Sequence, residues 1–279
     1  IHQNYVEEQR AEGNIIDESY DELEPEYKLS NIRQAKSIPT KLNMIGYEMA
    51  PIDDPREEIT EFQEEEVTNL AIYEHERWCE EKQHNGWTYD LVRDDELKHQ
   101  PCLVDWKLLP DNEKDKDINS IKNIPKILNS IGLKVVTTKL RLLAREKHRY
   151  YCEVVESNEF DDLPQDIQFS NYKQTERLVR TLGDLGYKLV PLEDERKGKD
   201  GLTDKEVEYL ARREHESWYL DNINLGWKYG SAKNKDKKIN PNLVSWEKLD
   251  EDVKRMDIRT IDNLPTLCRN VGLKIVELK

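Results

Sequence analysis

One pattern returns four times along the 279 residues of this chain, and it limits the architecture more than any other feature. In each copy a large aromatic residue precedes a leucine, two polar residues, a Pro or Val, and a glycine at matching spacing. The copies start at Tyr20, Trp106, Phe160 and Trp246 and end at Gly46, Gly132, Gly186 and Gly272. Repetition on this scale indicates one small unit used several times, and such units are stable only when packed on one another.

A second motif, His-x-x-aromatic, precedes the first in every copy. Its histidines are His2, His75, His148 and His215. We predict short units over residues 1–52 and 140–192, an acidic linker over 53–66, a charged linker over 193–203, and long units over 67–139 and 204–279. Whether neighbouring short and long units pack together, or the two long units meet, is open.

The spacing of apolar residues predicts helices in each unit. Val67 to Lys82 and Val207 to Trp218 follow helical periodicity, and Asn85-Gly86 and Leu225-Gly226 read as helix ends. A second helix is expected over Asn112–Ile131, kinked or divided at Pro125.

Short extended segments should follow or interrupt these helices. Candidates are Trp87–Tyr89 and Trp227–Tyr229, paired with Cys102–Val104 and Leu243–Val244 in hairpin-like inserts, and Lys134–Thr137, Lys188–Val190 and Lys274–Val276. The expected fold class is mainly α with short antiparallel β segments (α+β), built as tandem repeats of helix-pair units.

Composition excludes several classes of function. A net charge of −15 argues against general nucleic-acid binding and against binding to anionic membranes. No apolar run reaches the length of a membrane span. The four cysteines form no CxxC pair, which favours reduced thiols and a cytoplasmic location.

The long units resemble the ryanodine-receptor repeat (RyR) domain, which also occurs in bacterial proteins. The residues that carry the resemblance are His75-Glu-Arg-Trp78, Gly86-Trp-Thr-Tyr89, Leu109-Pro110, His215-Glu-Ser-Trp218 and Gly226-Trp-Lys-Tyr-Gly230. The resemblance implies a helical module, often in tandem pairs, that is regulatory and can hold an adenine nucleotide. The short units resemble degenerate copies.

Carried over residue by residue, the resemblance implies that the tryptophan of the motif stacks on a base and that a residue four positions later meets phosphate. Those pairs are Trp78 with Lys82 and Trp218 with Asn222. Lys82 keeps the positive charge, whereas Asn222 lacks it, so phosphate binding at the last unit is in doubt. Arg77 and Arg93 are further candidates for an anion in the second unit.

Each of these residues also has a structural interpretation. Trp78 and Trp218 could fill core positions at helix ends, and basic side chains usually pair with neighbouring acids. The position of His75 and His215 is a histidine in every unit. This recurrence fits a buried, hydrogen-bonded residue better than a catalytic one. His75 and Cys79 have metal-pair spacing, but no second pair completes a site.

No catalytic signature is present, so we expect a non-enzyme without cofactor or metal. The first hypothesis is a sensor module for a nucleotide, cyclic nucleotide or related small anion, regulating a larger protein. The alternative is a docking module with buried tryptophans, which could include self-association. Because the first unit starts at His2 without the helical run that precedes the other histidines, we also expect that the chain is a fragment of a longer protein or lacks its upstream residues. The resemblance implies that the missing part is an upstream regulatory domain.

Overall fold

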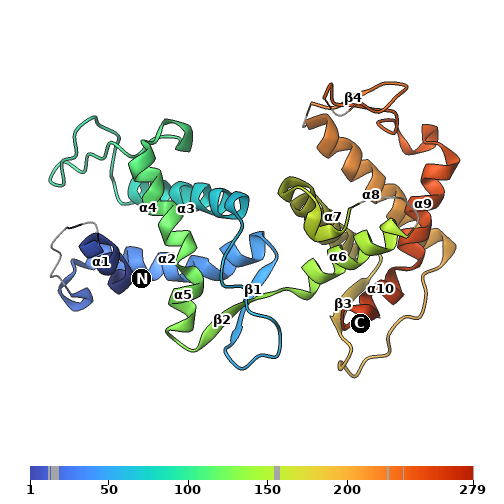
Figure 1. The fold of residues 1–279 in the computed structure, drawn as a ribbon, viewed down its shortest axis with the longest axis horizontal. Coiled ribbons are helices and arrows are strands. Elements are labelled where there is room, and N and C mark those ends of the chain that lie inside the picture. Colours follow the sequence, from blue (N-terminus) through green and yellow to red (C-terminus); the bar gives the residue numbers. More distant parts are fainter. Residues whose placement is uncertain (12, 14–18, 154–157, 225, 235, 279) are drawn as a thin grey trace. The chain divides into compact units, whose positions relative to one another are not determined.

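The computed structural model describes residues 1–11, 13, 19–153, 158–224, 226–234 and 236–278. The chain divides into two compact units, Ile1–Thr138 (unit 1) and Lys139–Lys279 (unit 2) (Figure 1). Each unit contains one predicted short segment followed by one predicted long segment. Adjacent short and long segments therefore pack together, which resolves the question that the repeats left open.

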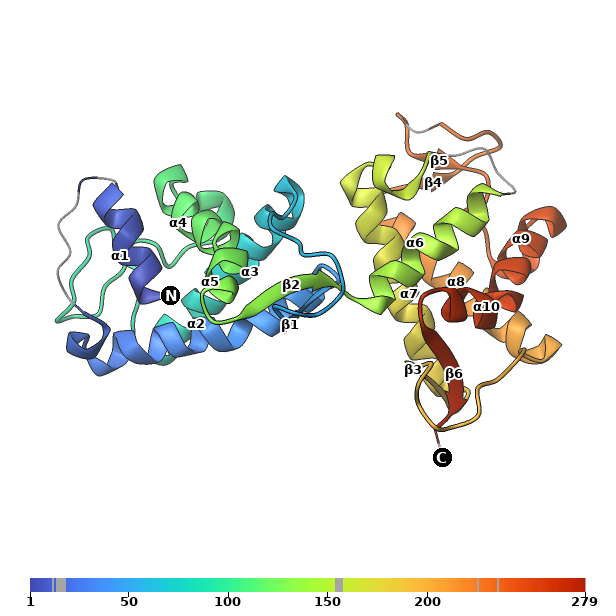
Figure 2. The same ribbon diagram turned by 60° about the horizontal axis from the view of Figure 1, so that its bottom comes forward.

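In unit 1 the short segment contributes two helices and a strand, and the long segment contributes three helices and a strand. The elements are α1 (His2–Ala11), α2 (Pro25–Met44), β1 (Tyr47–Pro51), α3 (Glu64–His84), α4 (Asp111–Lys122), α5 (Ile124–Asn129) and β2 (Leu133–Thr137). Single 3₁₀ turns at Tyr20–Glu22 and Trp106–Leu108 mark the start of each aromatic-to-glycine pattern. Strands β1 and β2 pair antiparallel, with Tyr47 opposite Thr137 (Figure 2).

Unit 2 follows the same order. Its elements are α6 (Lys139–Cys152), α7 (Gln165–Asp184), β3 (Tyr187–Pro191), α8 (Asp204–Asn224), β4 (Lys228–Tyr229), β5 (Ile239–Asn240), α9 (Glu251–Asp262), α10 (Leu264–Asn270) and β6 (Leu273–Glu277). The 3₁₀ turns recur at Phe160–Asp162 and Trp246–Lys248. Strands β3 and β6 pair antiparallel with Tyr187 opposite Glu277, the same register as in unit 1. The mainly helical α+β fold with small antiparallel strand pairs is confirmed.

Local sequence explains where the helices begin and end. Thr203 and Glu206 form a capping box, in which the backbone N–H of each residue donates to the side-chain oxygen of the other (2.7 and 3.4 Å). Gly86 and Gly226 end α3 and α8 with φ of 86° and 83°, values that side chains with a Cβ rarely adopt. The predicted break at Pro125 is confirmed, since α4 and α5 are separate helices that meet there.

Each unit has its own apolar core between the helices and the strand pair. In unit 1 the core centres on Leu42, Leu70, Ala71, Ile121 and Val135, and in unit 2 on Leu182, Leu210, Ala211, Cys268 and Ile275. The apolar start of α3 lies in this core, while its later turns carry His75, Trp78 and Lys82 away from it.

The predicted partner strands within the inserts are wrong. Strand β4 pairs with β5 in parallel, with Lys228 opposite Ile239, and in unit 1 Thr88 bridges to His99. Cys102–Val104 and Leu243–Val244 are not strands, because the chain turns there toward the following 3₁₀ helix. The insert is closed instead by earlier residues, His99 in unit 1 and Ile239 in unit 2.

The charged segments between short and long units are attached to the strand pairs. The backbone N–H of Ile59 donates to the carbonyl oxygen of Val135 at 2.8 Å. In unit 2 the backbone N–H of Lys199 donates to the carbonyl oxygen of Ile275, also at 2.8 Å. The Nζ of Lys134 donates to the carbonyls of Asp54 and Arg56. These segments therefore extend the edges of the sheets. Within the described ranges, no helix has the length and apolarity needed to cross a membrane.

Truncating a matched core leucine should destabilise the unit that contains it. Leu70 and Leu210 are completely buried, so Leu70→Ala and Leu210→Ala should each lower the free energy of unfolding by about 2–5 kcal/mol. Urea denaturation measures the cost, and hydrogen exchange locates it in unit 1 or unit 2 respectively. Leu97→Ala, at an exposed position, is the control, and an equal cost there would contradict the assignment of the core.

Candidate ligand-binding cleft

Unit 1 contains a cleft of about 1270 Å³ between its short and long segments. Helices α1 and α2 form one wall, and α3, α4 and the insert form the other. Aromatic side chains from both segments line it, namely Tyr5, Tyr27, Trp78 and Trp87. The cleft therefore exists only because a short and a long segment pack together.

A buried histidine supports the cleft wall. His75 is 3% exposed, and its Nε2 lies 2.9 Å from the carbonyl oxygen of Val104. Its ring lies between those of Trp78 and Trp106, at centroid distances of 6.0 and 5.8 Å. His215 is equally buried and repeats this arrangement. The predicted buried, hydrogen-bonded histidine is confirmed for both.

Both ring nitrogens of His75 face acceptors, because Nδ1 lies 3.5 Å from a carboxylate oxygen of Asp117. Burial disfavours the charged ring, but hydrogen bonds to Asp117, Cys79 and Val104 outweigh it and raise the pKa of His75 to about 10. Burial also raises the pKa of Asp117. The pair therefore retains a proton at neutral pH, and His75 is unsuited to act as a general base.

Trp78 is half-buried, with one part of the indole packed on His75 and another part lining the cleft. Trp218 is also half-buried, and Trp246 is buried against His215. Trp87 is buried too, although it reaches the cleft lining. The two tryptophans of the His-x-x-Trp motif, like Trp106 and Trp227, are thus only half-buried, which leaves part of each indole accessible.

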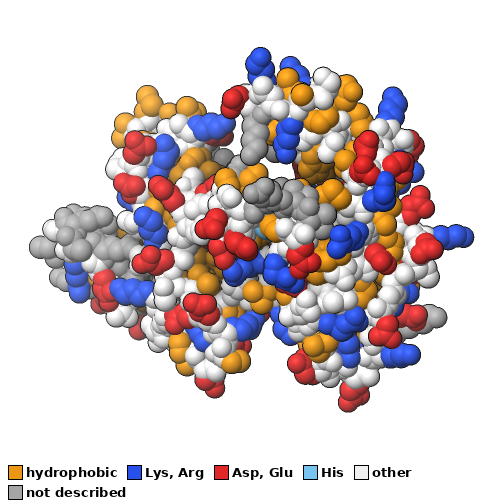
Figure 3. Space-filling model, turned by 45° about the vertical axis from the view of Figure 1, so that its right-hand side comes forward, with side chains coloured by type: hydrophobic (Ala, Val, Ile, Leu, Met, Phe, Trp, Pro, Cys, Tyr) orange, Lys and Arg blue, Asp and Glu red, His pale blue; other side chains and the backbone are white. Residues whose placement is uncertain are grey.

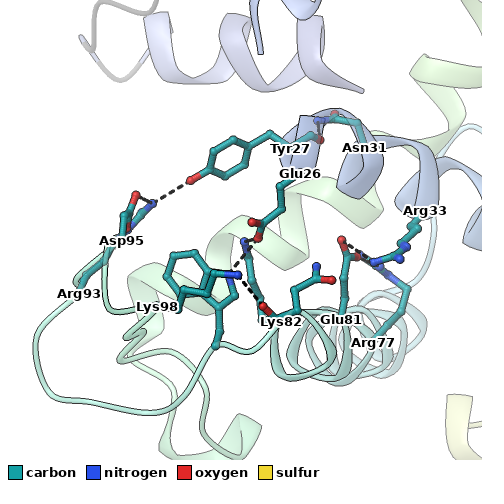
Figure 4. A network of polar contacts seen from close by, with 12 residues as sticks. Glu26, Tyr27, Asn31, Arg33, Arg77, Glu81, Lys82, Arg93, Asp95 and Lys98 are labelled. Carbon is teal, nitrogen blue, oxygen red and sulfur yellow. Dashed lines mark hydrogen bonds and ion pairs between the residues drawn. The ribbon is translucent and has the colours of Figure 1, made fainter. Parts of the chain in front are cut away.

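Lys82 lies at the end of α3 in a network that joins both segments (Figure 4). Its Nζ is 2.9 Å from Oε1 of Glu26, on α2, and 4.5 Å from the centroid of the Trp87 ring. The same Oε1 accepts the indole N–H of Trp87 at 2.9 Å. The hydrogen bond from Lys82 holds the pKa of Glu26 below its usual value.

The other predicted cations also have carboxylate partners. Arg77 donates to Glu74 and Glu81, with its shortest contact to each at 2.7 Å. Arg93 donates to Asp95 at 2.7 Å and to the hydroxyl of Tyr27 at 3.3 Å. Acidic and basic side chains are likewise interspersed on the face drawn in Figure 3. The structure gathers Trp78, Lys82, Arg77, Arg93 and His75 around one cleft, and it compensates each of these Lys and Arg charges locally.

Unit 2 differs at the matching positions. Asn222 donates its side-chain amide to the carbonyl of Trp218, one turn earlier in its own helix (2.9 Å). Asn222 itself carries no charge, which agrees with the doubt raised from the sequence. Burial raises the pKa of Asp257 to about 7; the charge of Glu214 acts in the same direction, whereas Lys147 opposes both.

The contribution of α2 was missed in the sequence. Glu26 and Tyr27 follow Pro25, which opens the helix, so their place in a first turn could have been read locally. The contacts of Glu26 and Tyr27 with Lys82 could not be predicted locally, because α2 and α3 are separated in the chain.

His75 and Cys79, four residues apart on α3, have the spacing of a metal-ligand pair. The Sγ of Cys79 lies 3.5 Å from Nε2 of His75. Burial raises the pKa of the nearby Cys102 thiol to about 11, which disfavours Cys102 as a thiolate ligand. Over the residues that the structure describes, no group of three or more His, Cys, Asp or Glu side chains could hold a metal ion.

Comparison with known families decides the identity of the repeats. The RyR domain matches residues 47–137 and 202–277, together more than half of the chain. The chain belongs to the RyR domain family. The first RyR match runs from β1 to the end of β2, so α1 and α2, which complete the cleft, lie outside it.

The buried carboxyl in unit 2 gives the second RyR segment a pH-dependent stability. The folded pKa of Asp257, about 7, exceeds the unfolded value of about 4, so the folded state favours the neutral acid. Its contribution is complete below about pH 4 and is lost as the pH rises through 7. We expect Asp257→Asn to stabilise unit 2 at pH 8, and this gain to shrink by on the order of 1–2 kcal/mol at pH 5.

Urea denaturation at both pH values measures this difference. Asp236→Asn, at an exposed position of the same unit, removes the same charge and should show no such pH dependence. A gain from Asp257→Asn that is the same at pH 5 and pH 8 would contradict the assignment.

Proposed function

We propose that this chain is a non-catalytic regulatory module whose unit 1 binds a nucleotide or a related ligand with a planar base. The observation that carries the proposal is the half-buried indole of Trp78, which faces a cleft of about 1270 Å³. That volume exceeds the usual range for small-molecule sites, so it leaves room for a sugar and phosphates beside the base.

The chemistry of the lining supports a stacked base. The indole face of Trp78 is held at a fixed angle by His75, so little freedom is lost when a ring stacks on it. Stacking of a base on an aromatic side chain typically contributes about 1–3 kcal/mol. Tyr5 and Tyr27, from the facing segment, provide further aromatic surface.

Charged groups of the same cleft suit the rest of such a ligand. Lys82, Arg77 and Arg93 lie along the wall that carries Trp78, where they could meet phosphates after exchanging a carboxylate partner. Membership of the RyR family supports a regulatory, ligand-binding module in general terms. The nucleotide and the cytoplasmic location are part of the proposal.

Removal of the Trp78 indole should abolish most of the binding. We expect Trp78→Ala to weaken adenosine and AMP binding about tenfold or more, because the stacking surface is lost. Trp78→Tyr, the residue type of the short units, should retain part of the affinity. Isothermal titration calorimetry with adenosine, AMP, ATP and cyclic dinucleotides measures these effects.

The matched control is Trp218→Ala, which removes the corresponding indole in unit 2. It should leave the affinity of the unit 1 cleft unchanged. If folded wild-type protein binds none of these ligands, the proposal is wrong. If Trp78→Ala binds them as tightly as the wild type, the site is elsewhere.

A second candidate function, protein docking, is favoured by the insert of unit 1. Leu91, Val92 and Leu97 are 80%, 71% and 65% exposed on a loop that closes through reciprocal backbone hydrogen bonds between Asp94 and His99. The matching loop of unit 2 closes the same way between Asn234 and Ile239, with Ser231, Ala232 and Lys237 in the place of the apolar residues. The apolar side chains are therefore not needed for the loop to form.

Self-association is the first form of docking to test. The triple variant Leu91→Ser, Val92→Ala, Leu97→Lys copies the unit 2 loop onto unit 1. If this loop docks on a second copy, light scattering should find concentration-dependent dimers for the wild type and monomers for the variant. Monomers of both proteins at every concentration would contradict self-association through the loop.

A further inference from the structure

We propose that Glu26 is an internal competitor for the anionic group of the ligand, so that the unit 1 cleft takes an uncharged base-containing ligand in preference to its phosphorylated form. The inference deepens the proposed function and rests on it for the identity of the ligand. It concerns the environment of Lys82.

The Glu26 carboxylate already occupies an anion-binding position. One oxygen, Oε1, receives both the ammonium of Lys82 and the indole N–H of Trp87, each at 2.9 Å. Lys82 is only 6% exposed, and its Nζ also lies 5.3 Å from the centroid of the Tyr27 ring. A phosphate oxygen would seek these same two donors, since both are strong partners for an anion.

While the Glu26 carboxylate fills this position, a phosphate of a ligand cannot reach the Lys82 ammonium and the Trp87 N–H. Lys82, Trp87 and Tyr27 all line the cleft, so a bound ligand could bring a phosphate toward them. It would then meet the negative charge of Glu26 at the Lys82 ammonium. A phosphate can replace the carboxylate there only if the Glu26 side chain leaves.

The Glu26 carboxylate is also able to leave this position. Its side chain is 33% exposed, so the carboxylate can rotate into water. It also belongs to the first turn of α2, where the helix dipole favours a negative charge even without Lys82. Release therefore costs mainly the contact with Lys82 and Trp87, which is the contact that the ligand replaces.

A purely architectural role for this ion pair is not supported by unit 2. There the residue matching Lys82 is Asn222, whose amide bonds to its own helix, and yet α7, α8 and their strand pair form in the same order. The pair between Lys82 and Glu26 therefore has no counterpart at Asn222, although the elements of unit 2 follow the same order. It occurs in unit 1, where Lys82 supplies a positive charge that would attract an anion.

The direct test is Glu26→Gln, which keeps the length and an acceptor oxygen but removes the negative charge. The Kd for AMP should fall about tenfold, because a charge-assisted contact to Lys82 no longer has a competitor. The Kd for adenosine should change by less than about twofold, since adenosine carries no anion. Calorimetry of both ligands gives the ratio of the two constants as the readout.

Glu24→Gln is the matched control. Glu24 is exposed, precedes the same helix and carries the same charge, so its removal changes the net charge equally. This variant should leave the AMP-to-adenosine ratio at the wild-type value. Lys82→Gln in the Glu26→Gln background should abolish the gain for AMP, and circular dichroism should confirm that all variants are folded.

Inorganic pyrophosphate separates failure of this inference from failure of the proposed function. If no nucleoside or nucleotide binds any variant, yet Glu26→Gln binds pyrophosphate more tightly than Glu24→Gln, the base-binding function is wrong and the competitor role of Glu26 stands. If folded Glu26→Gln gains affinity for neither AMP nor pyrophosphate, or gains equally for AMP and adenosine, the inference is overturned.

Discussion

The contact on which each half of this fold depends is that of one histidine with two aromatic rings and one backbone carbonyl. His75 joins the ring of Trp78, on its own helix, to that of Trp106 in the next 3₁₀ turn, and its Nε2 bonds the carbonyl of Val104. These contacts hold the long helix against the chain that returns from it. Because they join the two ends of the connecting segment, the length and sequence of that segment can vary.

That freedom explains how long and short segments share one plan. His148, in a short segment, bonds the carbonyl of Asn158 at 2.9 Å and contacts the rings of Tyr151 and Phe160. His2 contacts Tyr5 and Tyr20 in the same way. The short segments lack the insert but keep the geometry at both of its ends. A helix pair of this kind buries too little alone, and joining a short segment to a long one completes a core in each unit and, in unit 1, a cleft.

Charge is distributed through the structure as local pairs. Lys41 and Glu74 form a deeply buried ion pair, at 2.6 Å with both side chains at most 4% exposed, and Arg77 also bonds Glu74. Burial lowers the pKa of Lys41, while Glu74 opposes that effect. Breaking such a pair is costly because it leaves a buried charge uncompensated. The same compensation at the cleft means that an anion bound there would have to replace a carboxylate partner of Lys82, Arg77 or Arg93.

The sequence by itself determined the elements whose causes are local. Helix periodicity, the Thr203 cap, the glycine after α3 and the division at Pro125 follow from neighbours a few residues apart, and the repeated motifs identified the RyR domain. It also placed Trp78 and Lys82 together, since residues four apart share one face of a helix. The buried role of His75 and His215 followed from the repeat as well, whereas His2 and His148 are only half-buried.

The tertiary structure alone decided which segments meet. Glu26 reaches Lys82, and Ile59 reaches Val135, across long stretches of chain for which no local pattern specifies a partner. The insert pairs in parallel at Ile239 rather than at Leu243, because a strand register depends on the turn that closes it. The charge state of the cleft was decided in the same way. A sequence states which side chains carry charge, but only packing brings an opposite charge within hydrogen-bonding distance.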